Sequence, residues 1–163
     1  MGRPREAAVD ITLQFSTSKG LASRLIRFYS WSEFSHVDLV LPDGKLLGAR
    51  LDGGVQIRPP DYEQFTKVKR LVAAVTPRQG TRIYQLALDQ IGKPYQMKSI
   101  FGFAFRKDAV STGTWFCSEL VAWLFAKVGH PLVFKPVNRV SPEDLIVSPQ
   151  LKEETWELHA AMQ

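Results

Sequence analysis

Cysteine and histidine are scarce in this sequence of 163 residues, which contains one of the former and three of the latter. The single cysteine, Cys117, excludes an internal disulfide framework. The histidines His36, His130 and His159 are too widely spaced for a zinc-binding motif, so we expect no metal and no other cofactor. The lone thiol therefore needs an explanation of its own.

Long hydrophobic runs are absent as well. No stretch approaches the roughly 20 apolar residues of a transmembrane helix. Residues 1–10 lack the apolar segment of a secretory signal. These absences predict a soluble, cytoplasmic protein without a transmembrane segment, which phage lysis or a dedicated secretion system could still release.

The sequence does contain enough apolar material for one full core. It is 45% hydrophobic and 23% charged, and its length is that of one domain, so we expect residues 1–163 to form a single domain. The net charge of +5 favours anionic partners such as nucleic acid, anionic lipid or an acidic cell-wall polymer. Charge alone does not choose among them.

Strand patterns occupy the first half of the chain, where short apolar and β-branched segments alternate with turn residues. The clearest pair flanks the turn Pro42-Asp43-Gly44-Lys45, and we expect a hairpin with a two-residue Asp43-Gly44 loop. The expected strands are residues 11–15, 36–41, 46–50, 55–58 and 68–75.

Helical patterns dominate the second half, and with the strands before them they indicate an α+β fold. Gly92 and Gly129 are typical helix stop signals, and Ser141 followed by Pro142 is typical of a helix start. The connection 93–114 has no sustained periodicity. The expected helices are residues 21–29 with a basic outer face, 76–92, 117–129 and a short helix after Ser141.

Cys117 lies at the predicted start of a helix, where unpaired backbone amides and the helix dipole stabilise a thiolate. Most cytoplasmic cysteines are inert and buried, so the position alone does not indicate catalysis. His36, at the start of a predicted strand, supplies the base that thiol chemistry needs. A lone histidine is usually structural, but the pair predicts a catalytic dyad.

Three segments in a fixed order carry a family resemblance. Ser35-His36-Val37 precedes a strand and turn, Gly92-Lys93-Pro94-Tyr95 follows a helix, and Cys117-Ser118-Glu119-Leu120-Val121 begins one. Together they resemble the NlpC-type cell-wall amidases of papain-like fold, in the circularly permuted branch that includes YiiX-like and YaeF-like proteins. Residues 141–145 also resemble the tail of the permuted members.

The resemblance implies an antiparallel sheet or half-barrel packed against the helix that bears the cysteine. It implies a cysteine-dependent hydrolase that forms an acyl-enzyme, acting on amide bonds of cell-wall peptides. Cys117 would be the nucleophile and His36 the general base. The Cys117 backbone amide, together with the hydroxyl of Tyr95 as a substrate-binding residue, would stabilise the oxyanion. Tyr95 is as well explained as an aromatic that packs on the core.

The sequence leaves open which residue is the third catalytic residue, the one that orients the imidazole. The resemblance places it about a dozen positions after the histidine, where this sequence has Gly48. With a two-residue turn His36 would face Leu51, which cannot orient it. Asp38 lies two residues on, on the same strand face, and a one-residue bulge would instead bring Asp52 opposite the imidazole. Asp38 ranks ahead because it needs no bulge.

Two other functions fit the same sequence. The dyad could serve a thioesterase, acyltransferase or lipid esterase, for which nearby aromatic residues would suit an acyl chain. A non-catalytic module could instead bind an anionic surface through Arg24, Arg27, Lys67, Lys69 and Arg70. We expect a small peptide, cell-wall fragment or acyl substrate and no specific nucleic acid, and the oligomeric state is open. The aromatic residues are Trp31, Phe34, Phe101, Phe103, Phe105, Trp115 and Phe116.

Overall fold

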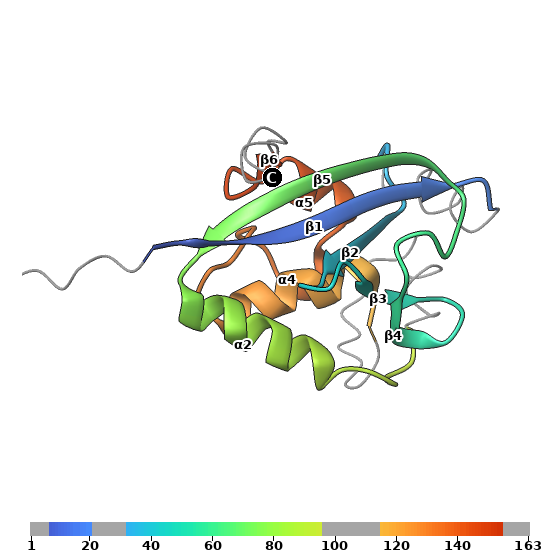
Figure 1. Cartoon of the computed structure of the whole chain (residues 1–163). Coiled ribbons are helices and arrows are strands. Elements are labelled where there is room, and N and C mark those ends of the chain that lie inside the picture. Colours follow the sequence, from blue (N-terminus) through green and yellow to red (C-terminus); the bar gives the residue numbers. More distant parts are fainter. Residues whose placement is uncertain (1–6, 21–31, 96–114, 155–163) are drawn as a thin grey trace, which may run out of the picture.

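A six-stranded antiparallel sheet is the centre of the computed structural model, which describes residues 7–20, 32–95 and 115–154 (Figure 1). The strand order is β4-β3-β2-β1-β5-β6, and every neighbouring pair is antiparallel. The strands are β1 (Val9–Ser18), β2 (His36–Val40), β3 (Leu46–Arg50), β4 (Gly54–Arg58), β5 (Phe65–Val75) and β6 (Lys152–Glu153).

The described helices are α2 (Pro77–Leu88), α4 (Cys117–Lys127), the 3-10 helix η1 (Val137–Arg139) and α5 (Pro142–Ile146). Helix α4 packs against β2 and β3, while α2 packs against β1 and α4. Figure 1 shows α2 and α4 beneath the long curved pair of β1 and β5. The predicted α+β class, with an antiparallel sheet against the cysteine-bearing helix, is confirmed.

Local sequence signals place the helix ends. Thr76 caps α2 by accepting the Gln79 N–H at 3.2 Å, and the Gln79 side chain accepts the Thr76 N–H in return. Helix α4 ends at Lys127, and the predicted stop residue Gly129 follows its C-cap with a φ of 73°. The N–H groups of Gly129 and His130 donate to carbonyls of the last helical turn, as in a Schellman motif.

Most predicted elements are present, with changed bounds. Strands β1 and β5 are longer than predicted, and the two-residue β6 was not predicted. Helix α2 ends at Leu88 rather than at Gly92, which lies in the turn beyond it with a φ of 88°. The predicted helix at 21–29 and residues 96–114 of the predicted connection lie outside the described residues.

The turn between β2 and β3 corrects the predicted two-residue loop. Gly44 N–H and Leu41 N–H donate to Leu41 O and Lys45 O, each at 2.8 Å, so the loop holds the three residues 42–44. Pro42 has no N–H to give to the strand ladder, and its fixed φ suits the second position of a turn. Gly44 has a φ of 82°, which closes the three-residue loop.

The longer loop changes the strand register by one residue. Leu39 pairs with Leu47, so the predicted pairing of His36 with Leu51 is wrong. Continued along both strands, the observed register sets Arg50 opposite His36. Because side chains alternate across a strand, this shift decides which side chains share a face with the imidazole.

The hydrophobic core joins alternate residues of the strands to the helices. On β1 and β5 the odd-numbered side chains from residue 11 to 15 and from 71 to 75 are buried in one cluster with the inner sides of α2 and α4. Glycine at position 80 allows α2 to approach the sheet, since a Cβ there would lie 3.0 Å from a Val9 methyl group. This packing fixes α4, and with it Cys117, against β2 and β3.

Candidate active site

Cys117 is the first residue of α4, as predicted, and its side chain is buried. The Glu119 carboxylate accepts the Phe116 N–H at 3.4 Å, which caps the helix start. The Ser118 hydroxyl donates to Val140 O at 2.6 Å and ties the same turn to the segment before α5. The thiol therefore lies at a fixed helix N-terminus, where the helix dipole favours negative charge.

His36 is the first residue of β2, and its imidazole contacts Asp38 on the same strand. The distance from Nε2 to Oδ1 is 2.8 Å, and the two side chains are 14% and 3% exposed. Residues two apart on a strand point to the same side, which explains why the pair forms within one short strand. The structure thus brings together His36 and Asp38, the first of the two acids considered at the sequence level.

The charge state of His36 depends on both of its neighbours. Burial alone lowers the pKa of His36, but the charges of Asp38 and Cys117 and hydrogen bonds with both raise the pKa to about 10. The imidazole is therefore protonated near neutral pH. A protonated imidazole between a thiol and a carboxylate can stabilise a thiolate and can later give its proton to a leaving group.

Gly48 on β3 makes room for the Asp38 carboxylate. A Cβ built on Gly48 would lie 2.0 Å from Asp38 Oδ1 and 3.4 Å from His36 Nε2. Any side chain at this position would therefore point at the imidazole and collide with the carboxylate. Position 48, where the resemblance expects an orienting residue, therefore has no side chain. The Asp38 carboxylate from the neighbouring strand β2 occupies the space that such a side chain would need.

Asp52, the alternative orienting acid, is not near the imidazole. It lies in the turn between β3 and β4, where its side chain is 98% exposed and its Oδ2 is 3.8 Å from Arg58 Nη2. The β2–β3 pairing has no bulge that would bring it opposite His36, because the additional loop residue lies in the hairpin turn instead. The Asp52 alternative is wrong for this reason.

Tyr95 lies close to the predicted nucleophile. It forms an isolated bridge with Trp115, two residues before Cys117, and its ring centroid is 5.5 Å from that of Phe116. Burial and then the charge of Cys117 raise the pKa of Tyr95, while the charge of Arg50 lowers it. The hydroxyl therefore stays protonated at ordinary pH and can donate a hydrogen bond.

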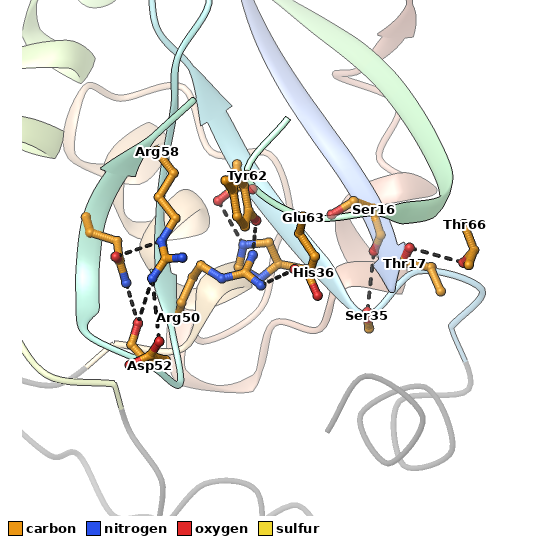
Figure 2. Close-up of polar contacts among 12 residues, drawn as sticks. Ser16, Thr17, Ser35, His36, Arg50, Asp52, Arg58, Tyr62, Glu63 and Thr66 are labelled. Carbon is orange, nitrogen blue, oxygen red and sulfur yellow. Dashed lines mark hydrogen bonds and ion pairs between the residues drawn. The ribbon is translucent and has the colours of Figure 1, made fainter. Parts of the chain in front are cut away.

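A cavity of about 150 Å³ opens beside the imidazole. Sequence reasoning did not find its polar wall, because the strand register that assembles this wall depends on a turn that was predicted one residue too short. Figure 2 shows Arg50 with its contacts to Tyr62 and Glu63, and Ser16 and Ser35 at neighbouring strand ends. The polar residues that line the cavity, besides Tyr95, are Ser16, Ser18, Ser35, His36, Arg50 and Glu63.

Comparisons with known proteins place this fold among YiiX-like proteins. The structure superposes on a crystal structure of metalloprotein YiiX from Escherichia coli O157:H7, DUF1105, with a TM-score of 0.66, 20% identity, and 92% and 96% coverage of the two chains. In sequence, the chain is 33% identical over 168 residues to a protein of Escherichia coli strain K12 named probable lipoprotein peptidase YaeF. No family model matches the sequence.

The chain is similar to YiiX-like and YaeF-like proteins in sequence and in fold. The sequence match covers 82% of this chain but 61% of YaeF, so the chain spans less than two thirds of that relative's length. The family resemblance seen in the three sequence segments is thus confirmed.

The description of YiiX as a metalloprotein raises the question of a metal site here. Within residues 7–20, 32–95 and 115–154, no group of three or more His, Cys, Asp or Glu side chains is placed to hold a metal ion. The described residues therefore do not fit a metal centre, and we assign no step to a metal.

Within the same ranges, no helix is long and apolar enough to cross a membrane.

Proposed function

We propose that this protein is a cysteine-dependent hydrolase that cleaves peptide or amide bonds through an acyl-enzyme. The observation that carries the proposal is the His36 imidazole, which interacts with Asp38 and with Cys117 at the start of α4. A buried imidazole between an acid and a helix N-terminal thiol is the arrangement that activates a sulfur nucleophile.

The reaction follows from these positions. Asp38 engages Nε2, which leaves Nδ1 as the ring atom that exchanges a proton with Cys117. The thiolate attacks the substrate carbonyl carbon, and the oxyanion that forms is stabilised by the Cys117 backbone amide and the Tyr95 hydroxyl. The C–N bond then breaks as the imidazolium gives its proton to the departing amine, and water hydrolyses the thioester with His36 as the base.

The order of the elements supports a circularly permuted papain-like arrangement over one domain of residues 1–163. The histidine strand β2 precedes the cysteine helix α4 in the chain, and α4 packs against β2. Because the dyad depends on spatial contact and not on chain order, either order can assemble the same chemistry.

The bond class is supported by the name of the relative YaeF, which is a probable peptidase. Cell-wall peptides remain the substrate class that the sequence resemblance predicts. The rival basic module has less support, because its described members Lys67, Lys69 and Arg70 have partners. Arg24 and Arg27 lie outside the described residues. The contacts pair Lys67 with Glu33, Lys69 with Glu153 and Arg70 with Gln14.

The test is acyl-enzyme formation, followed by intact-protein mass spectrometry. The purified chain is mixed with a γ-D-glutamyl-diaminopimelate peptide, an ordinary peptide amide and a fatty-acyl ester, and Cys117→Ala is the control. We expect a mass increase on Cys117 with a peptide or amide substrate and none in the control. Acylation by the ester alone would move the assignment to a lipid esterase or acyltransferase. Equal turnover by Cys117→Ala would refute thiol catalysis.

A further inference from the structure

Polar side chains from the neighbouring strands β1, β2 and β3 lie in one row along the cavity of the candidate site. Ser16 on β1 pairs directly with His36 on β2. Extended from the Leu39–Leu47 pair, the β2–β3 register sets Arg50 opposite His36 on the other side. Directly opposed residues on antiparallel strands project from the same face. A hydroxyl, an imidazole and a guanidinium therefore lie side by side along one wall of the cavity.

Arg50 is held in place by two residues from the segment before β5. Its Nη1 donates to the Tyr62 hydroxyl, its Nη2 donates to Glu63, and its guanidinium carbon lies 4.5 Å from the centre of the Tyr62 ring. A guanidinium has five N–H groups, so these two hydrogen bonds leave further donors for a ligand. Its orientation is fixed before any ligand arrives, which lowers the entropic cost of binding.

Ser16 provides a second donor that no described residue uses. Its side chain is 1% exposed, and its Oγ has no hydrogen-bond partner among the described residues. Its backbone carbonyl accepts the N–H of Ser35 at 3.1 Å, so the backbone of the residue is fixed. A buried hydroxyl without a partner is unfavourable, and a ligand acceptor would remove this cost.

We propose that this cavity is a subsite for a substrate carboxylate, bound by Arg50 and Ser16 next to the scissile bond. The inference rests on the proposed function and names its substrate class: peptides that carry a free carboxylate beside the bond to be cleaved. A carboxylate can accept from both donors at once, and a cavity of about 150 Å³ has room for such a group.

Glu63 tunes this subsite. Its carboxylate lies against Arg50 and lines the same cavity, so it partly neutralises the guanidinium and competes with a bound anion. Removal of the Glu63 charge should therefore strengthen binding of a carboxylate, whereas removal of the Arg50 charge should weaken it. The two changes have opposite signs, which a loss of folding cannot imitate.

The test compares two small alkylating reagents that differ in charge, since no natural substrate is needed. Iodoacetate carries a carboxylate and iodoacetamide a neutral amide, and with each the Cys117 thiolate displaces iodide and forms a carbon–sulfur bond. The readout is the ratio of the two alkylation rates at pH 7, measured by mass spectrometry. Iodoacetamide serves as an internal standard for thiol reactivity and access.

We expect Arg50→Gln to lower the iodoacetate-to-iodoacetamide ratio by about tenfold, as for loss of a charge-assisted hydrogen bond. Ser16→Ala should lower it less, and Glu63→Gln should raise it. Lys67→Gln is the matched control, because it removes the same charge from a residue that lines a different cavity, and it should leave the ratio unchanged.

An unchanged ratio in Arg50→Gln and Glu63→Gln, with Cys117 still alkylated rapidly by iodoacetamide, would overturn the subsite and leave the proposed function standing. Alkylation of wild-type Cys117 by iodoacetamide no faster than of an ordinary thiol would overturn the proposed function, and the subsite with it.

Discussion

Gly48→Ala tests whether Asp38 holds the His36 imidazole in place, because the added methyl group should push the Asp38 carboxylate away from the ring. The new Cβ would lie 2.0 Å from Asp38 Oδ1, far inside van der Waals contact. The carboxylate has to move by about 1 Å or more to reach an allowed distance. Its hydrogen bond to His36 Nε2 is 2.8 Å long, so a displacement of that size breaks it.

The expected cost follows from this geometry. Loss of a hydrogen bond between charged groups costs about 1.5–3 kcal/mol. Asp38 Oδ2 is buried without a hydrogen-bond partner among the described residues, so no existing bond compensates for the lost contact with His36. We therefore expect Gly48→Ala to lower the free energy of unfolding by ~2–3 kcal/mol. The pKa of His36 should fall, because the charge that raises it most strongly moves away.

The assay is an NMR titration of the His36 ring together with urea unfolding, for the wild type and Gly48→Ala. Gly44→Ala is a matched control in the same hairpin: nothing lies within 4 Å of its Cβ, and its φ of 82° is the only source of strain. It should cost about 1 kcal/mol without changing the His36 titration. A His36 titration in Gly48→Ala that coincides with the wild-type curve would refute the reasoning.

Two further predictions concern the same pair. Asp38→Asn should slow iodoacetamide alkylation of Cys117 near pH 7 by tenfold or more, on the order of a lost orienting residue, whereas Asp52→Asn should match the wild type; equal effects would contradict the assignment of Asp38. The raised pKa of His36 predicts that its contribution to stability is complete below pH 6.5 and lost as the pH rises toward about 10, with a slope of up to about 1.4 kcal/mol per pH unit. Urea unfolding at pH 6.5 and 9.5 should show this loss in the wild type and not in His36→Gln.

The sequence predicts best what is encoded locally. Three signals depend on a few adjacent residues each and act where the sequence indicates: the start of α4 at Cys117, the stop residue Gly129 just beyond its end at Lys127, and the Ser141 cap. The contact of His36 with Asp38 belongs to the same class, since two residues on one strand share a face whatever the strand pairs with. These features survive an error in the turn.

What the sequence misses depends on register. Pro42 was assigned to a strand end and belongs to the loop, and this single residue moves every pairing of β2 with β3. Because of this error in register, the sequence does not predict that Arg50 lies opposite the imidazole. It also gives no reason for a glycine at position 48. The missing signal was in the sequence, because proline cannot donate to a strand ladder and is rare inside one.

The contact between His36 and Asp38 does not depend on how β2 pairs with β3, because both residues lie on β2. An orienting residue on a neighbouring strand depends on register, whereas one on the histidine's own strand depends only on strand geometry. Here β3 needs only to leave space, and Gly48 does so. The double variant Asp38→Gly/Gly48→Asp moves the acid to β3, where its Cβ would lie 3.4 Å from His36 Nε2. If the imidazole requires only a carboxylate at that point in space, this variant should restore rapid alkylation of Cys117 that Asp38→Gly alone loses. If the double variant is as slow as the single one, the strand that carries the acid matters as well as its location.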